Sequence, residues 1–313
     1  MNGYNGIDSR SWHRLYFQAR FQTLLLLLFL GGFMLLIGRI VWGDSVLAWL
    51  LFGGAFLLLL GPAASPQLLL RFYQGRRLDW NQAPELHRLV LELSRAAGLE
   101  RLPDLYYLPT RLPNALAAGG RKQPVIALSE GLLRLLDRRE LAGVLAHEIS
   151  HLQNDDMNVL HLAGLVGRLL NGFSLFGQLL LLINLPLLFV GQTVNLKAIL
   201  LLIAAPYLNA VVQPALSRTR EYAADLGAVA LTGDAQGLIS ALAKLHRRSA
   251  GFWSRLLKVY RQPAWLRTHP PTEERIRRLR SLAAERSPVI HRQPTSFGGQ
   301  VRSDSVRFRQ PLA

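Results

Sequence analysis

The feature that most constrains the fold of this chain is a set of four long apolar runs that come in two pairs. Residues 23–37 and 46–60 form the first pair, and residues 169–190 and 198–212 form the second. A transmembrane helix needs about 20 mostly apolar residues, which each run approaches once its flanks are counted. The composition agrees, because 50% of the residues are hydrophobic and the mean hydropathy is +0.20. We therefore expect an integral membrane protein with about four transmembrane helices in two hairpins.

The first pair is predicted to form a hairpin over residues 21–62 that turns at Gly43-Asp44. Its pattern differs from that of a signal peptide, because no small-residue cleavage site is clear and a second apolar run follows at once. Arginines lie on both sides of the hairpin: Arg10, Arg14 and Arg20 before it, and Arg71, Arg76 and Arg77 after it. Positively charged flanks stay on the cytoplasmic side, so both chain termini are predicted to be cytoplasmic.

The second pair, within residues 159–213, contains more polar residues than the first. Asn171 and Gln178 interrupt its first run, and Pro206 interrupts its second. The two runs can cross the membrane as a hairpin around Lys197, or they can lie partly re-entrant against a soluble domain. We favour the crossing.

The remaining chain has the patterns of a soluble α+β domain that is mainly helical and contains a small sheet. Helices are predicted over residues 83–98 and 130–136, and short strands over residues 104–108 and 124–128. The segment 113–120 is either an ordinary edge strand with a turn or a place where small residues let another backbone approach closely.

Three further signals complete the helical part. Asp137 and Glu140 have the spacing of a capping box, Asp234 is a predicted N-cap, and residues 271–284 have the pattern of a basic amphipathic helix. We therefore expect six parts: a cytoplasmic N-terminal segment (1–20), a transmembrane hairpin (21–62), a first soluble part (71–158), a second hydrophobic hairpin (159–213), a second soluble part (214–285) and a flexible basic tail (286–313).

The formal net charge of +16 has two interpretations. One is nucleic-acid binding. The other is attraction to anionic lipid headgroups, because the arginines cluster beside the apolar runs and in the C-terminal tail. No nucleic-acid fold signature accompanies them. We therefore expect a lipid bilayer as the partner, and no nucleic acid.

The motif that carries chemistry is His147-Glu148-Ile149-Ser150-His151. Residues i and i+4 of a helix lie on one face, so the two histidines can bind one metal ion. Zinc accepts imidazole nitrogens readily. Glu148 would lie beside the metal, where it can take a proton from a water molecule, as metal-assisted hydrolysis requires. The alternative is a pair of surface histidines on an amphipathic helix.

Two histidines are too few for a catalytic zinc site, which usually has three protein ligands. The chain has no cysteine, so the third ligand must be a histidine or a carboxylate. Glu221 and Asp225 are spaced i and i+4 on a predicted helix. Glu221 can bind the metal while Asp225 orients a ligand histidine as a hydrogen-bond acceptor. The other interpretation is a solvated acidic face beside arginines.

Further short motifs occur along the chain in a characteristic order. They are Pro113-Asn114-Ala115, Glu130-Gly131-Leu132-Leu133, the motif from His147 to His151, Asp156-Met157, Ser217 to Asp225, and His269-Pro270-Pro271 with Arg275-Ile276. With the two apolar pairs, they make residues 1–285 resemble the HtpX-type membrane zinc metallopeptidases, relatives of the CAAX prenyl protease. Two features depart from the family: the link between the third and fourth runs is short, and the tail beyond residue 285 lies outside the resemblance.

The resemblance implies one zinc ion bound by His147, His151 and Glu221, with Glu148 as the general base. It also implies a gluzincin-like catalytic domain that faces the cytoplasm from a bacterial inner membrane. The expected activity is that of an endopeptidase that cleaves polypeptides, above all misfolded membrane proteins, in envelope quality control.

Three more residues gain a role only from the resemblance. His269 would assist catalysis near the oxyanion, although a lone histidine of this kind is also an ordinary loop residue. Asn114 and Ala115 match the family's edge strand, to which a substrate can add as a further strand.

Two rival functions fit the same sequence. One is a protease of prenylated proteins, since the apolar surroundings suit a lipidated substrate as well. The other is a catalytically idle membrane scaffold or chaperone with a structural zinc ion. The intact Glu148 argues against the scaffold, because a structural site has no use for a general base. The sequence makes no prediction of the oligomeric state.

Overall fold

The computed structural model of the chain describes residues 9–42, 45, 70–71, 73–189, 196–256 and 272–285. In chain order the elements are α1 (Ser9–Trp42), β1 (Arg76–Arg77), α4 (Pro84–Ala96), β2 (Asp104–Leu108), β3 (Ala115–Ala118), β4 (Val125–Ser129), α5 (Glu130–Leu135), α6 (Arg138–Asn154), α7 (Asp156–Phe189), α8 (Leu196–Thr232), α9 (Ala235–Leu256) and α10 (Thr272–Glu285). The predicted mainly helical fold with a small sheet is confirmed. The run 46–60, His269 and the tail from residue 286 lie outside the described residues.

The strands of the described residues form one mixed sheet in the order β1-β2-β4-β3. β2 and β4 are parallel, with Asp104 opposite Val125, whereas β1 and β3 are antiparallel to their neighbours. Every residue of β4 is buried. β3 lies at the edge of the sheet, and α6 packs beside it. The segment 113–120 therefore contains an edge strand.

The helix that carries the histidine motif begins as predicted. Asp137 accepts a hydrogen bond from the backbone N–H of Glu140, and Glu140 accepts one from the backbone N–H of Asp137, which completes the capping box. The apolar side of α6 packs into the main core through residues such as Leu145 and Ile149, both fully buried. This core fixes α6 against the sheet, and it leaves the two histidines at the border with α8.

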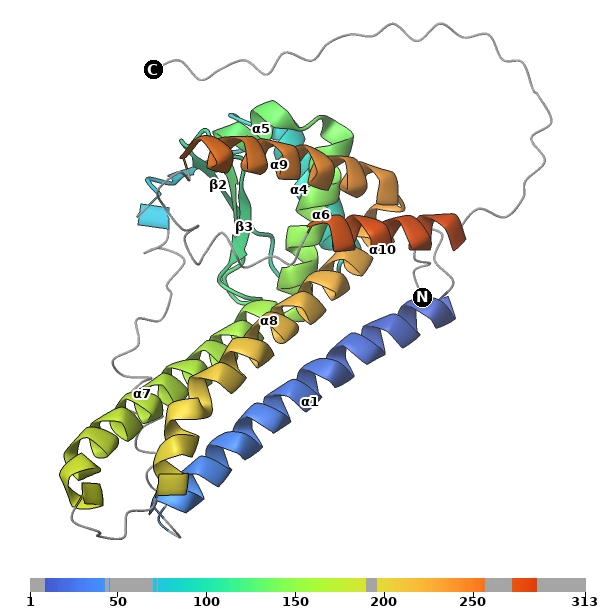
Figure 1. Ribbon diagram of the computed structural model, residues 1–313. Coiled ribbons are helices and arrows are strands. Elements are labelled where there is room, and N and C mark those ends of the chain that lie inside the picture. The colour runs from blue at the N-terminus through green and yellow to red at the C-terminus, as the bar shows by residue number, and fades with distance from the viewer. Residues whose placement is uncertain are drawn as a thin grey trace, which may run out of the picture.

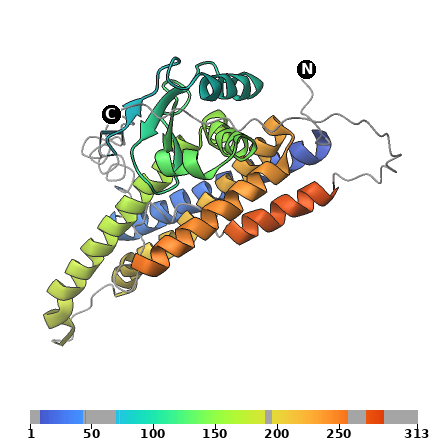
Figure 2. The same cartoon turned by 90° about the horizontal axis from the view of Figure 1, so that it is seen from above.

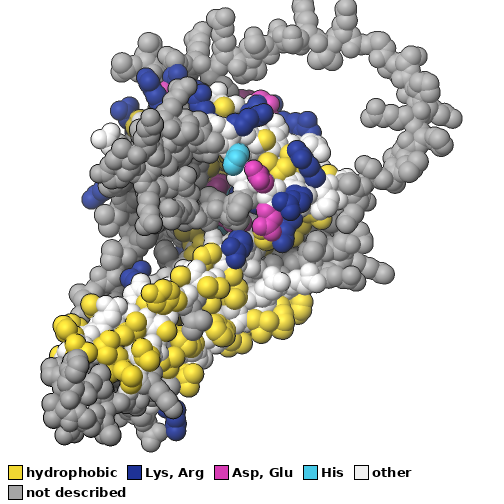
Figure 3. All heavy atoms as spheres, viewed as in Figure 1, with side chains coloured by type: hydrophobic (Ala, Val, Ile, Leu, Met, Phe, Trp, Pro, Cys, Tyr) yellow, Lys and Arg dark blue, Asp and Glu magenta, His cyan; other side chains and the backbone are white. Residues whose placement is uncertain are grey.

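Three long helices extend from one side of the sheet-containing part (Figure 1). α7 and α8 lie side by side, and α1 lies along α8, as a second view also shows (Figure 2). Leu170, Leu202 and Val212 form a separate small core between them. Hydrophobic side chains gather on the lower part of the face in Figure 3, over these helices, and charged ones around the upper part.

Two segments of the described helices are long and apolar enough to cross a membrane, Asp156–Ile183 and Ile199–Thr232. A shorter apolar stretch, Arg20–Phe33, lies in α1. The expectation of about four spans in two hairpins therefore stays a prediction, and half of the first pair lies outside the described residues. The apolar run predicted over residues 198–212 ends before α8 does, because the helix continues without a break to Thr232.

The packing of α6 against α8 depends on a glycine. A Cβ atom at position 227 would lie 2.9 Å from the Cβ of Ser150, and closer still to its hydroxyl oxygen. Ser150 is fully buried and immediately precedes His151. Gly227 therefore sets the distance between the helix that carries His151 and the helix that carries Glu221.

We expect Gly227→Ala to destabilise the fold by about 1–3 kcal/mol, because the added methyl group overpacks a tight helix contact. The midpoint of chemical unfolding in detergent measures this. Gly172→Ala is the matched control, since no atom lies within 4 Å of its added Cβ. Ser150→Ala should partly restore the Gly227→Ala variant. Equal midpoints for the two glycine variants would show that this contact is not tight.

Candidate metal centre

Two helices distant in sequence bring three potential metal ligands together. α6 supplies His147 and His151, and α8 supplies Glu221. One ligand atom from each residue lies within 4.8 Å of the other two. All three residues are buried, with relative exposures of 4%, 8% and 5%. The buried arrangement replaces the alternative of surface histidines and a solvated acidic face.

The distances between these ligand atoms fit a small tetrahedral metal ion. The Nε2 atoms of His147 and His151 are 3.2 Å apart. Glu221 Oε2 lies 3.4 Å from His147 Nε2, and Glu221 Oε1 lies 3.6 Å from His151 Nε2. Tetrahedral ligands bound to zinc at about 2.1 Å are about 3.4 Å from one another. The three side chains thus have the spacing of a zinc site.

A carboxylate behind each histidine orients its ring. Asp225 Oδ1 lies 3.0 Å from His147 Nδ1, and Asp156 Oδ2 lies 2.6 Å from His151 Nδ1. A proton held on Nδ1 by such an acceptor leaves the lone pair of Nε2 for a metal. The predicted role of Asp225 as an acceptor behind a ligand histidine matches this geometry.

An arginine of the C-terminal helix α10 joins the two acidic residues of α8. Arg275 donates two hydrogen bonds to Asp225, from Nη2 at 2.6 Å and from Nε at 2.8 Å. Its Nη1 lies 3.0 Å from Glu221 Oε2. Because the guanidinium is planar and binds Asp225 with two donors, it fixes that carboxylate in direction as well as in position.

When the two histidines are neutral, the other charges buried around the site do not balance. Glu148, Asp156, Glu221 and Asp225 are buried carboxylates, and Arg220 and Arg275 are the buried guanidinium groups near them, among the residues that the structure describes. With neutral histidines this leaves two negative charges in excess. Buried charges are costly unless they are paired. A dication at the three ligand atoms would remove the excess, so the residues present fit zinc in charge as well as in spacing.

The metal-free histidines hold protons more tightly than free imidazole does. Burial lowers the pKa of His151, but hydrogen bonds to Asp156 and Glu221 outweigh it and raise the pKa well above its usual value. Burial and Arg275 likewise lower the pKa of His147, and hydrogen bonds to Asp225 and Glu221 reverse that change. A metal that binds here must therefore displace protons.

The structure positions the other predicted residues as follows. Glu148 is buried at 6% exposure on the same helix as the histidines, and its charge acts on Arg275. Asn114 directly precedes β3, and its backbone exchanges hydrogen bonds with Ser129 of β4. Ala115 begins the edge strand that lies beside α6. His269 lies outside the described residues.

Three residues near the site were given no such role from the sequence. They are Asp156 behind His151, Arg220 beside Asp156, and Arg275 at Asp225. One signal was available for Arg275. It lies four residues before Leu279, and both are buried on the same face of α10. An arginine on the apolar face of an amphipathic helix indicates a buried acidic partner.

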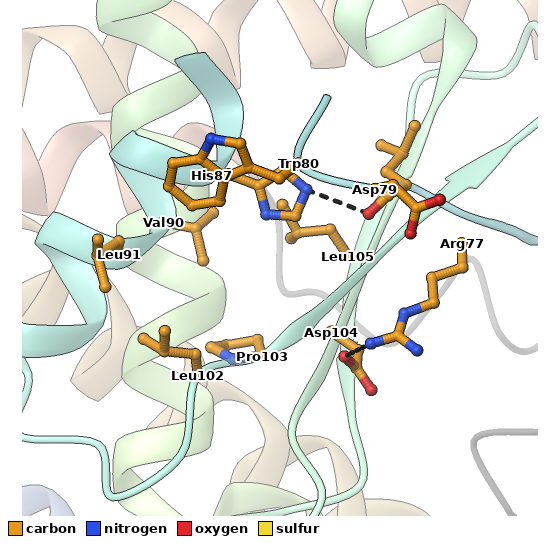
Figure 4. A pocket seen from close by; sticks show the side chains of 11 residues that line it. Arg77, Asp79, Trp80, His87, Val90, Leu91, Leu102, Pro103, Asp104 and Leu105 are labelled. Carbon is orange, nitrogen blue, oxygen red and sulfur yellow. Dashed lines mark hydrogen bonds and ion pairs between the residues drawn. The ribbon is translucent and has the colours of Figure 1, made fainter. Parts of the chain in front are cut away.

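A pocket of about 230 Å³ lies elsewhere, between β2 and α4. Trp80 packs over the ring of His87 at its rim, and Arg77 and Asp104 form an ion pair on its other side (Figure 4). None of its lining residues belongs to the metal cluster. The candidate chemistry therefore lies at the α6–α8 border and not in this pocket.

The family model and the sequence relatives that match this chain agree with each other. The family described as peptidase family M48 matches residues 81–283. The protease HtpX homolog of Persephonella marina is 33% identical over 291 residues, which cover 86% of this chain and 99% of that protein. The homolog of Burkholderia multivorans is 32% identical over 241 residues, 70% of this chain and 81% of its own length. The match to the crystal structure of S. mikatae Ste24p covers 88% of this chain and 67% of the Ste24p chain, with 20% sequence identity and a TM-score of 0.46.

We expect Glu221→Ala to lose zinc in a mild chelator, because two imidazoles and water make a weak site. Asp225→Asn should weaken zinc affinity by about ten- to a hundredfold, since it orients a ligand without forming the bond. His269→Ala and the exposed control Glu92→Ala should retain the metal. Zinc per chain after dialysis measures all four variants. Parental zinc content in Glu221→Ala would exclude Glu221 as a ligand.

Proposed function

The chain belongs to peptidase family M48 and is an HtpX-like metalloprotease, and from this premise we propose that it is a membrane-bound zinc endopeptidase. The observation that carries the proposal is the spacing of the Nε2 atoms of His147 and His151 and the carboxylate of Glu221, at 3.2–3.6 Å from one another. With both histidines neutral, as metal ligands must be, two buried negative charges are in excess, and a dication would balance them.

The chemistry of each side chain determines its role in the proposed reaction. Zinc bound to these residues would polarise the scissile carbonyl and lower the pKa of a water molecule. Glu148 takes the proton of that water and passes it to the leaving amine. Asp225 and Asp156 keep the two imidazoles oriented, and the buried surroundings keep bulk water away from the carboxylates.

The substrate is a polypeptide that binds in extended form. β3 is the edge strand nearest to the metal helix, so an added strand would run past the site. Asn114 and Ala115 lie at its beginning and would contact that strand. We assign His269 to the oxyanion side of the reaction, from its place in the His-Pro-Pro motif just before α10.

The second part of the proposal concerns the location of the protein in a membrane. We place the protein in a bacterial inner membrane with its catalytic part in the cytoplasm and with misfolded membrane proteins as its substrates. The apolar segments of α7 and α8 support the membrane location, and α8 continues from the apolar region to Glu221. A site at the end of a membrane helix is suited to chains that emerge from the bilayer.

We expect Glu148→Gln to keep the fold and the zinc ion but to lose about a hundredfold to ten-thousandfold in activity, because an amide cannot accept the proton. Turnover of a casein-type substrate measures this, and Glu92→Gln is the matched control, because Glu92 is an exposed residue of α4. Membrane proteins that accumulate with Glu148→Gln, but not with the parent, would identify the substrates. Near-parental turnover by Glu148→Gln would contradict the mechanism and favour a scaffold.

A second expectation concerns topology. If the arginine-flanked first pair and the α7–α8 pair both cross the membrane, an even number of spans leaves both termini in the cytoplasm. A reporter enzyme that is active only in the periplasm, fused after Ala313, should then be inactive. The same reporter placed near Lys197 should be active. Strong activity of the Ala313 fusion would reverse the proposed orientation.

A further inference from the structure

Arg220 is a buried arginine that the proposed reaction does not use. It is 4% exposed on α8, immediately before Glu221. Its Nη2 forms an ion pair with Asp156 Oδ1 and donates a hydrogen bond to the backbone oxygen of Asn154 at 3.3 Å. Both contacts are with the junction of α6 and α7, directly after the histidine motif. Arg220 therefore ties α8 to the end of the metal helix.

The carboxylate of Asp156 connects this arginine to a metal ligand. One of its oxygens pairs with Arg220, and the other accepts the hydrogen bond of His151 Nδ1 at 2.6 Å. Asp156 is the first residue of α7 and is fully buried. Without Arg220, one oxygen of this buried carboxylate has no cationic partner, so the side chain can turn away from its position toward water. His151 would then lose the acceptor that orients its ring.

A residue of the first helix completes the arrangement. Thr23 of α1 is 6% exposed, whereas Phe21, Leu24 and Leu25 beside it are exposed. Its hydroxyl oxygen accepts a hydrogen bond from Arg220 Nη1 at 3.4 Å. Two residues distant by 197 positions are joined in this way. The contact lies on the side of α1 that packs against α8.

From this connection we infer that Arg220 is a positioning residue of the metal centre, which holds Asp156 against His151 and is itself held by Thr23. The first apolar helix is thereby part of the support of the metal site. The inference rests on the proposed role of His151 as a metal ligand. It predicts that changes at Arg220 act on the bound metal and not only on the stability of the fold.

The test uses the full-length protein in detergent, with zinc affinity measured by competition with a chelator. Arg220→Gln should bind zinc about ten- to a hundredfold more weakly. Arg218→Gln is the matched control, because Arg218 lies on the same helix but is exposed, and it should bind zinc like the parent. Arg220→Lys, which keeps the charge but not the fork of donors, should recover part of the loss.

The visible spectrum of the Co²⁺-substituted protein separates positioning from mere stability, since it reports the ligand geometry of the bound metal. Arg220→Gln and Asp156→Asn should change this spectrum in the same way. The double variant should lose no more affinity than the worse single one, because both act through His151. Thr23→Val should weaken affinity by about two- to tenfold, the worth of one hydrogen bond, whereas the exposed control Gln22→Leu should not.

The outcomes distinguish this inference from the proposed function. If the parent and Arg218→Gln bind neither zinc nor Co²⁺, the metal site itself is wrong. If they bind and Arg220→Gln shows parental affinity and spectrum, only the inference fails, even if its unfolding midpoint falls. If Arg220→Gln does not fold, two other variants test the inference: the double variant Asp156→Asn/Arg220→Gln, which removes both charges, and Thr23→Val. The inference is overturned if both of these variants have the zinc affinity and the Co²⁺ spectrum of the parent.

Discussion

The burial of carboxylates at the border of α6 and α8 is the constraint on which the rest of the structure depends. Glu148, Asp156, Glu221 and Asp225 are at most 6% exposed. Each must find a cation or a donor, because the uncompensated burial of a charge costs more than most packing contacts return. Arg220 meets this need at Asp156, and Arg275 meets it at Asp225 and Glu221. With neutral histidines two negative charges remain, and a dication at the three candidate ligand atoms would balance them.

A single helix joins the membrane part to this chemistry. α8 has its prolines, Pro206 and Pro214, in or next to its apolar part, and its functional residues beyond them. From Arg220 onward the same helix carries Glu221, Asp225 and the tight contact at Gly227. Because a helix is stiff along its axis, the position of the apolar part in a bilayer and the position of Glu221 at the site are coupled. α1 reinforces the coupling through Thr23.

The sequence predicted best what depends on neighbours along the chain. The start of α6 follows from Asp137 and Glu140, whose capping interactions are made within one turn. The i and i+4 spacing of Glu221 and Asp225 likewise indicated that one could bind a metal and the other could support a histidine, because both point to the same side of a helix. Short strands could be located because apolar and turn residues alternate locally.

The sequence could not show which buried charged side chains pair with one another when they are far apart along the chain. Nothing near Arg220 indicates that its guanidinium meets Asp156, because α7 and most of α8 intervene. For Arg275, its place on the apolar face of its helix indicates a buried acidic partner, but not that this partner is Asp225, which is 50 positions away. Such pairs are set by how helices pack. The run 46–60 shows a different limit of sequence analysis. The length of an apolar run does not by itself decide whether the run crosses a membrane, so the number of transmembrane helices stays a prediction.

The distribution of these partners has a consequence for how the site forms. Its candidate ligands come from α6 and α8, but Asp225 and Glu221 have a buried guanidinium partner only when α10 has docked, because that partner is Arg275 among the described residues. Closing contacts over 50 and 128 positions costs chain entropy that the local helices alone do not offset. A chain that lacks a docked α10 would therefore keep two carboxylates of α8 uncompensated, and these would draw water or protons into the site. The geometry of the candidate metal site consequently depends on the C-terminal helix as well as on the histidine motif, although α10 supplies none of the three candidate ligands.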